Sequence, residues 1–189
     1  MNKSIISTVL ASGLLMAVSA SVYAVDTGTV NFSGKIVANT CEINVDGSNS
    51  DTSTVTFADT YTSDYGSDGA IGTSKDFTIA LKKCDPLITN LNLMFTGTTT
   101  DGDNLRLENN LSGVGKATNV GITVTNNNGG SSNVVFDGSV PDASTDLAND
   151  ITGASETVFS YTANVIQVGA AIPTTGQYAA SASFEVYYR

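Results

Sequence analysis

The 189-residue chain has no histidine, no tryptophan and only two cysteines. Without histidine it cannot build a Ser-His-Asp triad or a Cys-His nucleophile pair, and a zinc site would lack one of its common ligands. The two cysteines are not spaced as a CxxC redox motif, and no pair of carboxylates stands out. A Ser–Lys dyad needs no histidine and stays open, but no motif indicates one. We therefore predict a protein that is not an enzyme and that uses no cofactor or metal.

Basic residues are also scarce. Eight lysines and arginines stand against 18 aspartates and glutamates, which gives a net charge of −10. Nucleic acids and anionic membrane surfaces are bound mainly through lysine and arginine. The charge balance therefore argues against both as partners.

The N-terminus has the pattern of a secretory signal peptide. A short basic start, residues 1–3, precedes an apolar run over residues 5–18, and Val22 and Ala24 place small side chains before a cleavage point. A membrane anchor fits less well, because the apolar run is too short to span a bilayer comfortably. We expect residues 1–24 to be removed, which leaves a mature chain of 165 residues with a net charge of −11.

Cys41 and Cys84 are predicted to form one disulfide, since an even number of cysteines in an exported chain indicates pairing in an oxidising compartment. The bridge would close a loop of 43 residues. On the chain-entropy estimate, closing a loop of that length stabilises the fold by roughly 4 kcal/mol.

Short segments with alternating apolar residues recur along the mature chain, without the 3.6-residue pattern of a helix. They lie at residues 29–37, 55–57, 77–81, 91–95, 120–124, 134–136 and 159–165. Asn126–Gly130 is a strong turn signal, residues 141–150 form a polar loop with room for one helical turn, and the acid-rich stretch 59–76 is predicted to be a surface loop. Strands at this spacing predict a single all-β, immunoglobulin-like sandwich.

The last fourteen residues, 176–189, carry the clearest strand pattern. Every even position from Tyr178 to Tyr188 is apolar and most odd positions are polar, so one face is expected to be buried. A terminal strand has no following hairpin to cover its outer edge, and an unpaired apolar edge is a hazard for a soluble protein. Either the chain covers this edge itself or another molecule does.

The mature N-terminus, residues 25–34, also alternates, and it places Gly28, Val30 and Phe32 on one face. One interpretation is that it forms the first strand of its own sandwich. The other is that it is a detachable strand whose Val30 and Phe32 fill pockets on another subunit.

These residues resemble the subunits of chaperone–usher pili, in particular the type 1-like fimbrial major subunits. The resemblance rests on Gly-Thr-Val-Asn-Phe-Ser-Gly-Lys-Ile-Val (28–37), on the cysteine that follows it at Cys41, and on Phe-Thr-Ile-Ala-Leu-Lys-Lys-Cys ending at Cys84. The C-terminus adds a penultimate tyrosine, Tyr188, alternating apolar residues before it, and a glycine fourteenth from the end, Gly176.

The resemblance implies an incomplete immunoglobulin-like β-sandwich, the pilin fold, which a donor strand from a neighbouring subunit completes. It divides the chain into a signal peptide (1–24), a donor-strand extension (25–34) and a pilin domain (35–189). In the extension, Val30 and Phe32 would fill the neighbour's groove, and Gly28 would allow close backbone approach. The strand at the groove edge, to which a chaperone also binds, would comprise Gly176, Ala182, Phe184, Val186, Tyr188 and Arg189.

The implied function is structural. The chain would be a subunit of an adhesive surface pilus, exported through the periplasm and polymerised with copies of itself by a chaperone and an outer-membrane usher. The terminal carboxylate of Arg189 would be held in a basic cleft of the chaperone. Asp26 departs from the family pattern, because a charged residue stands where groove filling favours an apolar or small one. Two alternatives stay open: a shaft subunit that also binds a host carbohydrate or receptor, and an autonomous exported β-sandwich.

Overall fold

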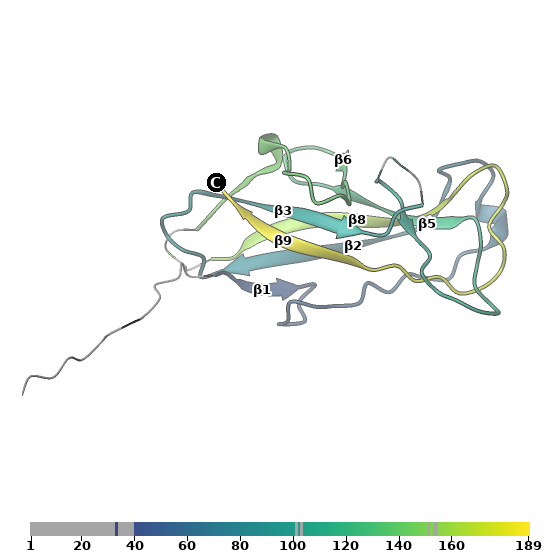
Figure 1. The fold of residues 1–189 in the computed structure, drawn as a ribbon, viewed down its shortest axis with the longest axis horizontal. Coiled ribbons are helices and arrows are strands. Elements are labelled where there is room, and N and C mark those ends of the chain that lie inside the picture. Colours follow the sequence, from purple (N-terminus) through teal and green to yellow (C-terminus); the bar gives the residue numbers. More distant parts are fainter. Residues whose placement is uncertain (1–32, 34–39, 101, 103, 151, 153–154) are drawn as a thin grey trace, which may run out of the picture. The chain divides into compact units, whose positions relative to one another are not determined.

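The computed structural model describes residue 33 and residues 40–100, 102, 104–150, 152 and 155–189 (Figure 1). The expected signal peptide and the donor-strand residues Gly28, Val30 and Phe32 lie outside the described residues. Residues from 40 onward belong to one compact unit, Val37–Arg189.

That unit is built from strands in two sheets, as the alternating pattern predicts. The strands are β1 (Glu42–Val45), β2 (Ile71–Lys82), β3 (Asn90–Gly97), β4 (Leu107–Glu108), β5 (Val120–Asn126), β6 (Ser132–Asn133), β7 (Leu147–Ala148), β8 (Thr157–Gln167) and β9 (Ala182–Tyr188). One sheet has the order β1-β2-β8-β5-β4, with β6 paired to β5, and the other has the order β7-β3-β9. Two 3₁₀ turns, η1 (Thr62–Asp64) and η2 (Ala143–Thr145), are the helical elements of the described chain, and η2 confirms the turn expected in the 141–150 loop.

The core lies between the two sheets and is centred on β2, β8 and β3. Phe159 and Ile79, which face each other across the β2–β8 ladder, are almost completely buried. The ring of Tyr161 stacks on Phe77 at a centroid distance of 5.4 Å and meets Phe95 of the opposite sheet edge-on, also at 5.4 Å. These aromatic contacts join the two sheets across the core.

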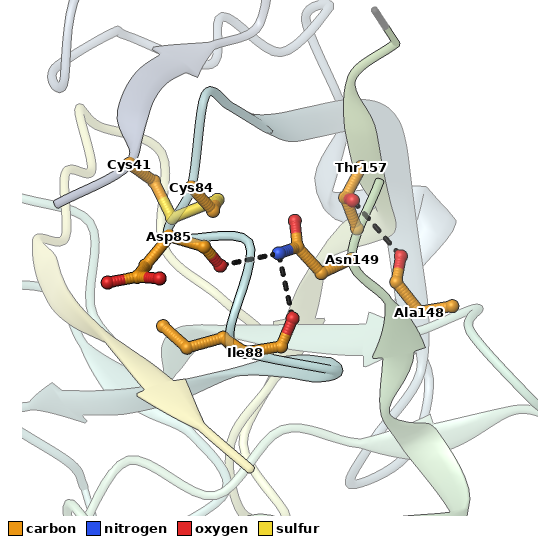
Figure 2. The surroundings of a disulfide bond; sticks show 7 residues. All are labelled: Cys41, Cys84, Asp85, Ile88, Ala148, Asn149 and Thr157. Carbon is orange, nitrogen blue, oxygen red and sulfur yellow. Dashed lines mark hydrogen bonds between the residues drawn. A yellow bond between two sulfur atoms is a disulfide. The ribbon is translucent and has the colours of Figure 1, made fainter. Parts of the chain in front are cut away.

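Cys41 and Cys84 form the predicted disulfide (Figure 2). Cys84 follows β2, and the turn from β2 to β3 is held in place by Asn149, whose Nδ2 donates to the carbonyl oxygens of Asp85 (3.0 Å) and Ile88 (2.9 Å). We call this region, with the β2–β3 turn and the C-terminal end of β9, the disulfide end. The opposite end, where β2 and β5 begin and β8 finishes, is called the far end.

Five sequence predictions need correction. The segment 134–136, predicted as a strand, follows the two-residue β6 and belongs to no named strand. The loop predicted at 141–150 contains the short strand β7. The final strand is shorter than expected, because β9 begins at Ala182 rather than at Gly176. Val55 and Phe57 lie in a segment without strand pairing, although both side chains pack against the core. The acid-rich stretch 59–76 is not all loop, since its last residues, from Ile71, begin β2. The alternating pattern reports burial, and burial does not require a ladder partner.

Candidate functional site: the free edge of β9

Strand β9 lies at the edge of its sheet. Among the described strands it pairs with β3 alone, antiparallel, with Gly97 opposite Ala182 and Leu91 opposite Tyr188. Its other side therefore pairs with no strand of the described chain. Figure 1 shows β9, in yellow, running beside β3. An edge of this kind offers a row of backbone N–H and C=O groups to any extended chain that lies beside it.

The side chains of β9 are less buried than those directly opposite them on β3. Leu91 is 0% exposed, whereas Tyr188, its partner in register, is 40% exposed. Phe95 is buried at 8% exposure, whereas its partner Phe184 is only partly buried, with their ring centroids 6.0 Å apart. Paired residues of one ladder point to the same face. The same apolar face is therefore covered over β3 and left partly uncovered over β9.

Val186 repeats this contrast against the buried Leu93. Val55 and Phe57 of the unpaired segment are likewise only partly buried against the core. Phe57 reaches Tyr178, in the segment that leads into β9, at a ring-centroid distance of 6.1 Å. The β9 edge and this unpaired segment thus both carry apolar side chains that pack against the core but are only partly buried.

The segment before β9 is bonded to the loop that precedes β5. The buried side chain of Asn109 lies at the centre of these bonds, because its Nδ2 donates to the carbonyl oxygens of Ala117 (2.8 Å) and Gln177 (3.2 Å). Its Oδ1 accepts from the backbone N–H of Ala179 (3.1 Å). This network holds residues 177–179 against the loop, and the ladder with β3 starts at Ala182, opposite Gly97, the last residue of β3.

Gly176 lies at the start of this segment, outside the strand. Its φ is +154°, and a Cβ at this position would come within 2.5 Å of the Gly115 carbonyl oxygen and 2.6 Å of the Ala117 nitrogen. No side chain fits against backbone at that distance, so glycine is required for the segment to lie against the loop.

Arg189 fixes the C-terminal end of β9 through hydrogen bonds. A main-chain oxygen of Arg189 accepts hydrogen bonds from the backbone N–H groups of Thr89 (3.2 Å) and Asn90 (2.9 Å). Its guanidinium donates to Asp146 Oδ1 (2.5 Å) and to the Pro141 carbonyl oxygen (2.7 Å), and the hydrogen bond to Asp146 raises the pKa of Arg189. The C-terminal end of β9 is thereby held against β3 and the 141–148 segment.

Sequence reasoning identified Ala182, Phe184, Val186 and Tyr188 as the residues of this strand's inward face, and the structure brings them together on β9. It missed Asn109 and Asp146, which hold the two ends of the segment. Nothing in a single sequence distinguishes either residue from the many other polar loop residues.

The described residues contain no cluster of three or more histidine, cysteine, aspartate or glutamate side chains that could hold a metal ion. In the same part of the chain, no helix has the length and hydropathy needed to cross a membrane.

Comparisons with known proteins agree on one family. A family model described as "Fimbrial protein" matches residues 30–189. The minor fimbrial subunit HifD of Haemophilus influenzae is 37% identical over 183 residues, which cover 93% of this chain and 80% of the relative. Long polar fimbria protein A of Salmonella typhimurium is 31% identical over 183 residues, 95% of each chain.

Among solved structures, the P pilus rod subunit PapA superposes with a TM-score of 0.58 at 28% sequence identity, covering 85% of this chain and all of that one. The CupB6 tip adhesin of Pseudomonas aeruginosa superposes with a TM-score of 0.53 at 20% identity, which indicates a shared fold over 66% of this chain.

Proposed function

The chain belongs to the fimbrial protein family, and from this membership we propose that its copies polymerise by donating the strand Val25–Gly34 to the β9 edge of a neighbour. As a member of the family it is a structural subunit of a cell-surface pilus and not an enzyme. Its all-β sandwich is the incomplete immunoglobulin-like fold of pilins.

The observation that carries the proposal is the contrast across the β3–β9 ladder. Phe184, Val186 and Tyr188 share the inward face of buried β3 residues but remain partly exposed at an unpaired edge. A strand added to β9 would satisfy the free backbone groups and cover these side chains, which is the strand-addition mode of peptide recognition. Complexes between pilus subunits and their chaperones are an established instance of this mode, so it is already known for this class of protein.

The extension has the composition that such a strand needs. Val30 and Phe32 would point into the uncovered face, and each buried side chain of this size contributes about 1.5–3 kcal/mol. Gly28, on the same face, would allow close backbone approach. We assign the extension to residues 25–34, the preceding residues 1–24 to a signal peptide and residues 35–189 to the pilin domain.

The place where the extension joins the domain favours donation to another copy. Cys41 lies at the disulfide end, the same end of the domain at which β9 finishes. A strand that ends at Gly34 and folds back on its own β9 would run parallel to it, unless residues 35–40 stretched back along the whole strand. Each ladder between the named strands is antiparallel, and a strand from a neighbouring copy can enter in that direction.

Before assembly, a periplasmic chaperone would occupy the same edge and an outer-membrane usher would catalyse the exchange. The chaperone would bind this edge next to Arg189. The main chain of Arg189 is already fixed at the end of β9, because the backbone N–H groups of Thr89 and Asn90 donate hydrogen bonds to it. A second function, recognition of a host carbohydrate or receptor along the fibre, is compatible with a shaft subunit, but no specific feature of the described surface favours it.

The test is a pair of substitutions on opposite faces of the extension. Phe32→Asp places a charge on the face that enters the neighbour and should abolish fibres on cells that export the full chain, because burying an unpaired carboxylate costs several kcal/mol. Ser33→Asp points the same charge to the other face and should leave fibres, counted by electron microscopy, close to the level of the unsubstituted chain. Equal fibre numbers from both variants would contradict the proposal.

A further inference from the structure

Exposed apolar side chains gather at the far end of the domain. Val114 is fully exposed, at 109% of its reference area, and Ile71 and Ile172 are more than half exposed. All three lie at the far end, because Ile71 pairs with Ile166 where β8 finishes, and the loops of Val114 and Ile172 are joined there by a hydrogen bond between the hydroxyls of Thr118 and Thr174 (3.1 Å). We call Ile71, Val114 and Ile172 the far-end patch.

The backbone conformation around Val114 places its side chain on the outside of the domain. The residue stands between Gly113 and Gly115, whose φ angles of +95° and +91° turn the loop sharply on both sides. The loop is anchored beneath this tip, where Gln177 N–H donates to the Gly115 carbonyl oxygen (2.7 Å). A valine held at the tip of an anchored loop cannot turn into its own core.

At the disulfide end, Leu87 is exposed to a similar degree, at 89%. It lies in the β2–β3 turn, where its N–H donates to the side chain of Asp85 (2.9 Å). Asn149 fastens this turn to β7, so Leu87 is also carried on an anchored loop. The two most exposed large apolar side chains of the described chain, Val114 and Leu87, thus lie at opposite ends of one domain.

We propose that the far-end patch of one copy packs against Leu87 of the following copy in the fibre. The inference rests on the proposed strand donation, and it concerns a second contact outside the β9 edge. A donated strand that runs antiparallel to β9 ends beside the start of β9, at the far end of the accepting copy. The donor's own domain resumes at Cys41, in its disulfide end.

The short chain between the donated strand and its own domain keeps the donor domain close to the acceptor. Residues 35–40 separate the donated strand from Cys41, and six residues span at most about 20 Å even when fully extended. The disulfide end of the donor is therefore confined near the far end of the acceptor. When two exposed apolar surfaces are held this close, packing them together is favourable, because it removes apolar surface from water.

Cysteine cross-linking tests the contact in the full exported chain. Fibres that carry Leu87→Cys and Val114→Cys are collected, oxidised and denatured without reductant. We expect a ladder of covalent multimers that collapses to monomer on reduction. The matched control carries Leu87→Cys and Val158→Cys, because Val158 is exposed on β8 but pairs with Ala80 near the disulfide end, the same end as Leu87. Its multimers should be lower by roughly tenfold, since no tether holds that pair together.

Fibres that form normally but give no ladder, or equal ladders in both variants, would overturn the contact and leave strand donation standing. If the first double variant makes no fibres, the single variants Leu87→Cys and Val114→Cys are exported together. A covalent dimer found only in the mixed sample then supports the contact, and its absence overturns it. Failure of strand donation itself is reported separately, by equal fibre numbers for Phe32→Asp and Ser33→Asp.

Discussion

At the scale of single residues, Gly176 shows how a backbone position shapes the β9 edge. It is unlike most glycines of the chain because both its φ of +154° and the packing around it exclude a side chain. Gly130 has a similar φ of +146°, but a Cβ there would have no neighbour within 4 Å. The two positions therefore separate backbone strain from steric conflict.

We expect Gly176→Ala to destabilise the domain by roughly 3 kcal/mol or more, since strain of about 1–3 kcal/mol is added to a forced displacement of the 115–117 backbone. Gly130→Ala should cost only the strain, about 1–3 kcal/mol, and therefore less than Gly176→Ala. Urea unfolding of the two variants measures the difference. Equal losses would show that the segment before β9 can move away from the loop without cost.

At the scale of elements, β9 differs from β3 in having one partner strand instead of two. The cross-strand pair Phe95 and Phe184 makes this difference measurable, because both are phenylalanines on the same face and only Phe95 is buried. We attribute the exposure of Phe184 to the missing neighbour and not to a weakness of the strand itself.

Phe95→Ala should cost about 3–5 kcal/mol in the free domain, the usual loss for a buried phenylalanine. Phe184→Ala should cost clearly less, about 1–2 kcal/mol, because much of its area is already in contact with water. In the presence of a peptide of residues 25–34, the Phe184→Ala domain should bind roughly tenfold more weakly than the unsubstituted domain, as measured by calorimetry. Equal affinity would show that the peptide does not cover this side chain.

Prediction from the sequence succeeded where a single rule, either the alternation of apolar residues or the pairing of cysteines, determined the structure. The period of two correctly predicted β2, β3, β5 and β8, and cysteine pairing was predictable from the even count in an exported chain. The start of β9 could not be predicted, because Tyr178 and Ala180 continue the alternation while Asn109 holds the backbone of residues 177–179 against another loop. The strand predicted at Val55 and Phe57 was wrong for a related reason, because these residues pack against the core without a partner strand. The short β4 and β7 lack any pattern long enough to detect.

At the scale of the whole molecule, the domain is a sandwich that carries its own disulfide but leaves one strand position open. The disulfide joins Cys41, close to the start of the described domain, to Cys84, just after the end of β2. Anything that binds the folded state and not the unfolded chain raises stability by mass action. Under the proposed strand donation, the stability of this subunit would depend on the strand that it receives, first from the assembly machinery and then from another copy.

Strand donation is open to a decisive test by thermal unfolding of the oxidised domain Lys35–Arg189, with and without a peptide of residues 25–34. Burial of Val30 and Phe32 together is expected to add roughly 3–6 kcal/mol, which corresponds to a rise in Tm of about 10–20 °C for a domain of this size. The same peptide with Phe32→Asp should give little or no rise. A domain whose Tm is unchanged by the unsubstituted peptide would contradict strand donation and would leave an autonomous sandwich that needs no donor.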